Sequence, residues 1–180
     1  MPTIIVVGGP SGTGKSTVGE SLSQSLRCRF VEGDAFHPKA NIDKMSQGIA
    51  LTDDDRWGWL ENLTNIAADA TSESKTVVVS CSMLNKKYRD FIKEVAAKKN
   101  PNITLFMIFL YNDYSIIYDR MSQRKGHFMK SSMLKSQFDA MEVPEHEQNA
   151  VAIYCGEKTE QQIQDEALQA ARQNIPDLII

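Results

Sequence analysis

The sequence is short of several features that would each point to a particular class of protein. Its three cysteines, Cys28, Cys81 and Cys155, are widely spaced and form no CxxC pair, so neither a disulfide framework nor a zinc site is predicted. Lysine and arginine number 20 against 23 acidic residues, and the net charge of −3 argues against a nucleic-acid partner. The longest apolar run, Leu105 to Tyr111, is far too short to span a bilayer, so no membrane partner is expected.

What is present is typical of a globular protein. The 180 residues are 42% hydrophobic and 24% charged, which suits one domain spanning 1–180. Met1-Pro2-Thr3 leads directly into an apolar run and leaves no room for a signal peptide. We therefore expect an intracellular, cytoplasmic protein.

Short β-rich runs alternate with longer helical patterns along the chain. A helix is predicted over Lys86–Lys99, and Asn100-Pro101-Asn102 should stop it. Strands that alternate with helices predict an α/β fold, here a five-stranded parallel sheet flanked by helices. The expected strands are Ile4–Val7, Phe30–Glu32, Thr76–Ser80, Ile103–Leu110 and Val151–Tyr154.

Two segments are longer than simple connections. Residues 38–74 hold two helical patterns, and Thr52 is placed to cap the second. Residues 123–143 are polar and rich in methionine. Because ligands gather at the carboxyl ends of parallel strands, we expect 38–74 to be a substrate-binding insertion and 123–143 a lid.

The first apolar run is followed directly by a phosphate-binding loop. Its glycines allow the backbone to turn N–H groups toward phosphate oxygens, and the following helix points its positive end at the same place. Lys15 is expected to contact the outer phosphates and Ser16 to bind a magnesium ion, so ATP and Mg²⁺ are the predicted cofactors. The predicted ATP-binding residues of the loop are Gly9, Pro10, Ser11, Gly12, Thr13, Gly14, Lys15, Ser16 and Thr17.

Other classes of phosphate-loop protein fit less well. Asn85-Lys86-Lys87 is followed by Tyr88, so the guanine-reading pattern Asn/Thr-Lys-x-Asp fails. The run Thr76–Ser80 ends without the magnesium-binding aspartate of a motor ATPase. The size and the two insertions favour a small-molecule kinase.

Two residues after the second expected strand are candidates for the acceptor side. Asp34 would face the γ-phosphate, where a carboxylate can orient or deprotonate an acceptor hydroxyl; the alternative is a helix-capping aspartate. His37 either binds substrate or simply caps and packs.

Two arginines are candidates for binding an anionic acceptor. Arg56 follows three aspartates, so an ion pair with them competes with anion binding. Arg89 has a guanidinium fork that suits a carboxylate, with a solvated helix face as the alternative. Trp57 and Trp59 are expected to pack in the core or at its rim.

Arg120 and Arg124 are four residues apart, on one face of a predicted helix that leads into the lid. One can reach the triphosphate while the other stacks on the base; the alternative is a charged helix surface.

Several longer blocks occur in order along the chain. They are Gly33-Asp34-Ala35-Phe36-His37-Pro38, Asn41-Ile42-Asp43-Lys44-Met45, Leu51 to Leu60 with its two tryptophans, Cys81-Ser82-Met83-Leu84 with Tyr88-Arg89-Asp90, and Gly126-His127-Phe128-Met129 with Ser136-Gln137-Phe138. In these blocks and the phosphate loop, over residues 5 to 144, the chain resembles the gluconokinase family.

The resemblance implies phosphorylation of the 6-hydroxyl of D-gluconate by MgATP, with Lys15, Asp34 and Arg124 as catalytic residues. Asp34, His37, Arg56, Arg89 and His127 would bind gluconate. Arg120 and Arg124 would serve the nucleotide.

Two alternatives stay open, namely a kinase for another small acceptor such as shikimate and a non-catalytic regulator switched by nucleotide. A homodimer is one oligomeric state open to this chain, and the sequence does not decide it.

Overall fold

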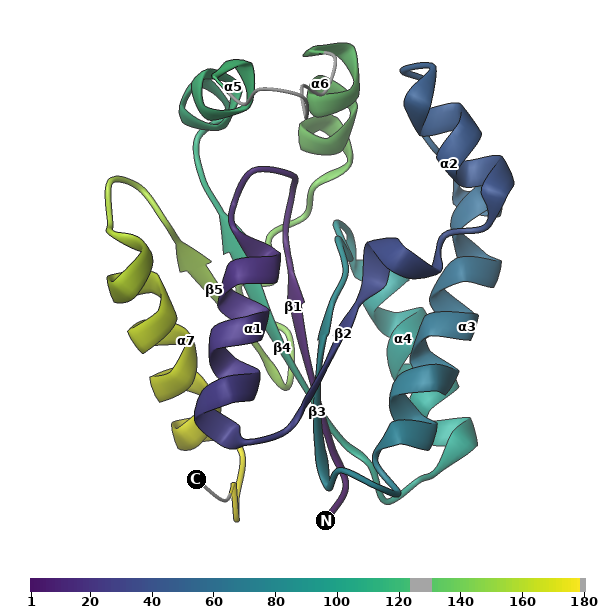
Figure 1. The fold of residues 1–180 in the computed structure, drawn as a ribbon, viewed down its shortest axis with the longest axis vertical. Helices are drawn as coiled ribbons and strands as arrows, with labels where there is room; N and C mark the ends of the chain where they lie inside the picture. The colour runs from purple at the N-terminus through teal and green to yellow at the C-terminus, as the bar shows by residue number, and fades with distance from the viewer. Residues whose placement is uncertain (124–130, 179–180) are drawn as a thin grey trace.

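The computed structural model describes residues 1–123 and 131–178. A five-stranded parallel sheet forms its centre, in the order β2-β3-β1-β4-β5 (Figure 1). The strands are β1 (Thr3–Gly8), β2 (Arg29–Glu32), β3 (Thr76–Ser80), β4 (Thr104–Tyr111) and β5 (Ala150–Tyr154). Each lies within one residue of the run that the sequence predicts at both ends, so the α/β prediction is confirmed.

Helices cover both faces of this sheet. Figure 1 shows α1 and α7 on one side, α3 and α4 on the other, and α2, α5 and α6 beyond the ends of the strands. The helices are α1 (Lys15–Leu26), α2 (Lys39–Ser46), α3 (Asp53–Ala70), α4 (Lys86–Lys99), α5 (Tyr114–Ser122), α6 (Ser131–Ala140) and α7 (Glu160–Asn174), with a 3₁₀ turn η1 (Gly33–Phe36). No helix in the described ranges is long and apolar enough to cross a membrane.

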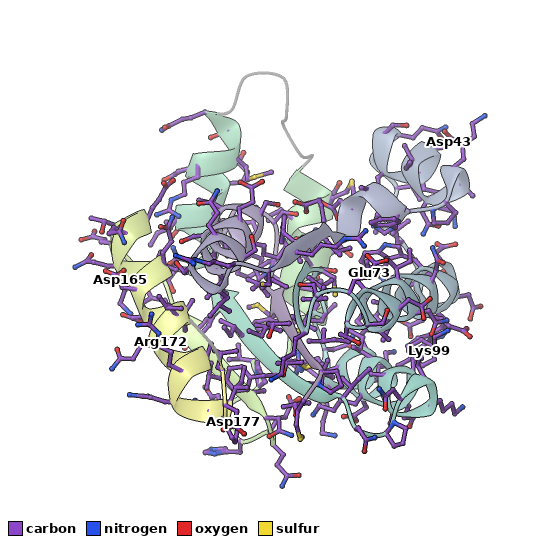
Figure 2. All side chains as sticks on the ribbon, turned by 60° about the horizontal axis from the view of Figure 1, so that its bottom comes forward. Asp43, Glu73, Lys99, Asp165, Arg172 and Asp177 are labelled. Atoms are coloured by element: carbon purple, nitrogen blue, oxygen red, sulfur yellow. The ribbon has the colours of Figure 1, made fainter. Side chains whose placement is uncertain are left out.

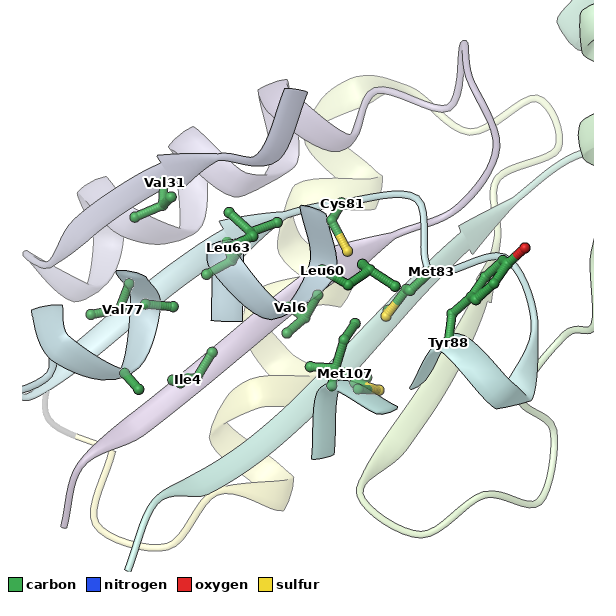
Figure 3. Packing of buried hydrophobic residues seen from close by; sticks show 14 of the residues in the cluster. Ile4, Val6, Val31, Leu60, Leu63, Val77, Cys81, Met83, Tyr88 and Met107 are labelled. Carbon is green, nitrogen blue, oxygen red and sulfur yellow. The ribbon is translucent and has the colours of Figure 1, made fainter. Parts of the chain in front are cut away.

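The two faces of β1 explain why its sequence is continuously apolar. Successive side chains of a strand point to opposite faces of the sheet. Ile4 and Val6 therefore pack under α3 and α4, whereas Ile5 and Val7 pack under α1 and α7. Figure 3 shows the first of these clusters, in which Leu60 and Leu63 of α3 lie over the strands.

Local sequence signals set the ends of the helices near the site. Thr52 caps α3 through a capping box: its hydroxyl accepts from the Asp55 N–H, and the Asp55 carboxylate accepts from the Thr52 N–H. Asn85 caps α4 by accepting from the Tyr88 N–H. Both helices begin at the edge of the sheet where the strands end, so their first turns face the same region.

Charged residues of both signs lie around the periphery. Figure 2 labels Asp43, Glu73, Lys99, Asp165, Arg172 and Asp177, all of them exposed and spread over different elements.

Candidate active site

The phosphate loop lies between β1 and α1, at the centre of the strand order. The chain passes from β1 to one side of the sheet and later returns to the other side of β1 with β4, so a crevice opens at the end of β1. Gly9 has φ of 132°, and a Cβ there would lie 2.0 Å from the Leu110 carbonyl oxygen. Gly14 adopts the left-handed conformation directly before α1. The loop therefore needs glycine at both positions to reach its path.

Side chains of the loop are tied back to its own backbone. The Thr13 hydroxyl donates to the Pro10 carbonyl at 2.8 Å, and Lys15 Nζ donates to the same oxygen at 3.3 Å. Lys15 and Ser16 begin α1, whose free N–H groups and dipole favour anions. This arrangement can bind phosphate.

A cavity of about 380 Å³ opens on the α7 side of the loop. Arg120 of α5 lines it, as the sequence predicts for a nucleotide-side arginine, although its contact with a nucleotide stays a prediction. The sequence interpretation missed the residues that follow β5 here. The lining consists of Gly12, Thr13, Gly14, Thr17, Val18, Arg120, Lys158, Glu160, Ile163 and Gln164.

A second cavity, of about 220 Å³, opens on the α3 side of the same loop. Two residues of the phosphate loop, Ser11 and Lys15, line this cavity. The cavity therefore faces the position expected for the terminal phosphate. It brings together residues from five separate segments. They are Ser11, Lys15, Asp34, His37, Met45, Ala50, Leu51, Arg56, Trp59, Ser82, Met133, Ser136 and Gln137.

Asp34 and His37 enter this cavity from η1. The Asp34 side chain is 77% exposed and lies 3.9 Å from His37 Nε2, which leaves its carboxylate open to a ligand. The His37 ring stacks on Trp59, with centroids 3.9 Å apart. Burial lowers the pKa of His37 from its usual value; Asp34 opposes this, and Arg56 adds to it.

Arg56 projects from the first turn of α3 toward the cavity without an ion pair in the described structure. Two of the three neighbouring aspartates pair elsewhere: Asp53 with Lys87 and Tyr88, and Asp55 with Lys44 at 2.8 Å. Within the described residues, Arg56 Nε is buried without a hydrogen-bond partner, and Nη2 donates only weakly to Leu51 at 3.3 Å. An orphaned cationic donor of this kind is costly unless a ligand satisfies it.

The structure corrects the prediction that Arg89 binds gluconate. The Arg89 side chain is 0% exposed and forms a two-pronged ion pair with Glu147, with Nη2 to Oε2 at 2.7 Å. Its remaining donors reach the carbonyl oxygens of Met83 and Glu142. Since all three guanidinium nitrogens bond within the protein and the side chain is fully buried, Arg89 is closed to a ligand. The solvated helix face considered as its alternative is wrong for the same reason.

Gln137 of α6 contacts the phosphate loop directly, a contact the sequence interpretation missed. Its Oε1 accepts from the Ser11 N–H at 2.8 Å, and its Nε2 donates to the Ser11 hydroxyl at 3.0 Å. Arg124 and His127 lie outside the described residues, and α5 ends at Ser122, before Arg124. The roles predicted for these two residues remain predictions.

Trp57 and Trp59 pack as expected, at the rim and in the core. Trp59 is buried and its Nε1 donates to the Gly33 carbonyl at 3.0 Å, so it supports η1. Trp57 lies against Tyr88 and Phe91.

Comparison with known proteins gives consistent matches over most of the chain. The family model of shikimate kinase matches residues 11–172. The thermosensitive gluconokinase of Escherichia coli is 42% identical over 146 residues, which cover 81% of this chain and 75% of that protein. A probable gluconokinase of Saccharomyces cerevisiae is 37% identical over 181 residues, which cover 96% of this chain and 92% of that protein.

Solved structures agree with these matches. A crystal structure of a gluconokinase from Sinorhizobium meliloti superposes with a TM-score of 0.83 at 43% identity, over 96% of this chain and 94% of that one. The APS kinase of Mycobacterium tuberculosis superposes with a TM-score of 0.66 at 16% identity, which shows the fold alone.

The parallel sheet, the phosphate loop after β1 and the cavities on both sides of that loop define a phosphate-loop kinase. With relatives of 37% to 43% identity over most of its length, the chain belongs to the gluconokinase family. It is therefore an enzyme of the transferase class.

Proposed function

We propose that the protein transfers the γ-phosphoryl group of ATP to the 6-hydroxyl of D-gluconate, giving 6-phospho-D-gluconate and ADP. The observation that carries this proposal is the wall of the smaller cavity. There a carboxylate, Asp34, and a guanidinium, Arg56, whose Nε has no hydrogen-bond partner among the described residues, line the same cavity as Ser11 and Lys15 of the phosphate loop.

The acceptor's two ends match these two groups. Gluconate carries a carboxylate at one end, which Arg56 would bind through a charge-assisted pair. Its 6-hydroxyl lies at the other end and would approach the loop beside Asp34. The cavity volume of about 220 Å³ suits a small acceptor of this kind.

The transfer itself would use Asp34 and Lys15. The 6-hydroxyl oxygen forms a bond to the γ-phosphorus, its proton passes to the Asp34 carboxylate, and the bond from that phosphorus to the ADP oxygen breaks. Lys15 and the loop N–H groups would stabilise the charge that gathers on the phosphates. Catalysis would consist mainly of positioning and charge neutralisation.

The loop also has the donor chemistry for a magnesium ion. Magnesium prefers oxygen ligands and is commonly held by few protein groups together with substrate phosphates. The Ser16 hydroxyl, in the first turn of α1, is the protein ligand we assign. When bound, the ion would supply charge neutralisation to the phosphates. Arg120, and Arg124 by prediction, would hold the nucleotide in the larger cavity.

The test is acceptor-dependent ADP release from MgATP, measured with gluconate, shikimate and no acceptor. Shikimate is included because the shikimate kinase family model matches this chain, and because shikimate also carries a carboxylate and hydroxyls. We expect gluconate to be the preferred acceptor, with phosphorus NMR placing the product phosphate on carbon 6. Lys15→Ala should lower kcat by about a hundredfold or more.

Three results would contradict the proposal: preference for shikimate, phosphate on another carbon, or ADP release that no acceptor stimulates. The last result would favour a nucleotide-switched regulator.

A further inference from the structure

Asn41 is a buried polar residue that links α2 to both α3 and η1. It is 2% exposed, and its Nδ2 donates to the Asp55 carbonyl oxygen at 2.9 Å. The same Nδ2 lies 3.3 Å from His37 Nδ1. An amide nitrogen has two hydrogens and accepts none, so both partners must be acceptors.

The backbone carbonyl of Asp55 fixes which way the Asn41 amide points. A carbonyl oxygen only accepts, so turning the amide over would place two oxygens against each other. With one Nδ2 hydrogen on Asp55, the second points to His37. His37 Nδ1 must then be unprotonated, and the neutral ring carries its hydrogen on Nε2.

His37 Nε2 lies on the side of the ring that faces Asp34, at 3.9 Å from Oδ1. The ring is held there by its stack on Trp59 and its side chain is only 5% exposed. We infer that Asn41 is a positioning residue that holds His37 as the Nε2–H tautomer. His37 is thereby a fixed hydrogen-bond donor to a substrate oxygen beside Asp34, and not a second base. This inference rests on the proposed function for the identity of that oxygen.

The charges around the ring support a neutral His37. Asp34 from η1 and Arg56 from α3 are the charged groups that face it, and burial is the main cause of its lowered pKa. Protonation would also place a hydrogen on Nδ1, against the Asn41 amide hydrogens. The division of roles is then clear: Asp34 accepts a proton and His37 donates a hydrogen bond.

The first experiment measures the tautomer in the whole protein and does not depend on catalysis. Nitrogen-15 NMR of the histidine ring at neutral pH should show Nδ1 unprotonated and Nε2 protonated. Asn41→Leu should abolish this preference. Lys44→Met is the matched control, because it removes the other tie between α2 and α3, the ion pair with Asp55, without touching His37. It should leave the tautomer as in the wild type.

A protonated Nδ1 in the wild type would overturn the inference even if Asn41→Leu failed to fold. An equal change of tautomer in Lys44→Met would also overturn it, since the cause would then be loss of helix docking.

The second experiment tests whether His37 donates from the Nε2 position, by using two amide side chains of different length. Glutamine carries its amide nitrogen to about the position of histidine Nε2, whereas asparagine reaches only about the position of Nδ1. His37→Asn should therefore lose about tenfold more kcat/KM for gluconate than His37→Gln, with KM for ATP similar in both. Equal losses would show that only packing on Trp59 matters and would reject the donor role.

The two proposals can fail separately. If the wild type phosphorylates no gluconate, the proposed function fails, while the tautomer measurement still decides the role of Asn41.

Discussion

Arg56 and Arg89 show two opposite environments for the same side chain. Arg89 lies where α4 meets the segment before β5, and Glu147, Met83 and Glu142 accept hydrogen bonds from all three of its guanidinium nitrogens. Arg56 lies at the wall of the acceptor cavity with a buried Nε that has no partner in the described structure. Both are arginines near the start of a helix, and the sequence proposes the same role for both.

The difference teaches that a structural arginine is distinguished from a binding arginine by whether its guanidinium hydrogen bonds are already made within the protein, and not by its charge. A buried and fully paired guanidinium stabilises the fold and offers nothing to a ligand. A buried but unsatisfied donor at a cavity gains free energy when a carboxylate enters. The predictions below test this distinction, beginning with the largest effect.

The comparison places the chemistry in the cavity that Arg56 lines. The largest effect is therefore expected from changing the carboxylate of that cavity, Asp34. Asp34→Asn keeps the size of the side chain but removes its charge and its ability to accept a proton. We expect kcat to fall by about a hundredfold or more, with little change in ATP affinity. Steady-state kinetics and nucleotide binding measure this. Asp54→Asn, an exposed residue of the first turn of α3, is the control and should stay near the wild type. Loss of ATP binding with normal kcat at saturation would make Asp34 a nucleotide or metal ligand instead.

Replacing each arginine by methionine should separate stability from activity. Arg89→Met leaves Glu147, whose side chain is 12% exposed, without its partner. Breaking a buried pair in this way costs about 3–5 kcal/mol of the free energy of unfolding, measured by urea denaturation. The second change Glu147→Leu should recover part of this loss. Arg56→Met should cost much less, because Arg56 has no ion pair within residues 1–123 and 131–178. Equal destabilisation by both would remove the distinction.

These two environments also mark the limit of what the sequence could predict. The strands, the α4 bounds and the Thr52 cap came from patterns within a few residues, because hydrophobic period and capping are local. The burial and pairing of Arg89 depend on Glu147, which is 58 residues away in the sequence. Gln137 and Ser11, which are in contact, are 126 residues apart. No spacing rule connects such pairs. The residues after β5 that line the larger cavity were missed for a different reason. They follow the carboxyl end of a parallel strand, so their place at the same end of the sheet as the phosphate loop could have been inferred from the sequence.

Acceptor choice tests the carboxylate directly. Glucose has a 6-hydroxyl but no carboxylate, so it would leave Arg56 unpaired in the cavity. Losing a buried charge-assisted partner costs about 2–5 kcal/mol, which predicts at least about thirtyfold lower kcat/KM for glucose than for gluconate. In Arg56→Met this preference should fall toward one, whereas Arg89→Met should retain it. Measuring both acceptors with all three proteins at fixed MgATP is decisive. An unchanged preference in Arg56→Met would show that another group binds the carboxylate.

The smallest expected effect concerns why Arg56 is not paired with an aspartate in the part of the chain that the structure describes. Asp55 pairs instead with Lys44 and with the Thr52 N–H, and these contacts lower the pKa of Asp55 to about 2. A lowered pKa in the folded state means that the charged form stabilises the fold. That contribution is complete above about pH 4, the ordinary range of an aspartate, and is lost as the pH falls through about 2. The difference in free energy of unfolding between wild type and Asp55→Asn should therefore shrink on acidification through this window. Carboxyl NMR titration gives the direct measurement: Lys44→Met should return the pKa of Asp55 toward its usual value. The Thr52 N–H should keep part of the lowering in this variant. If Lys44→Met left the pKa of Asp55 unchanged, Lys44 would not be the partner of that carboxylate, and the explanation of why Arg56 is left unpaired would fail at its first step.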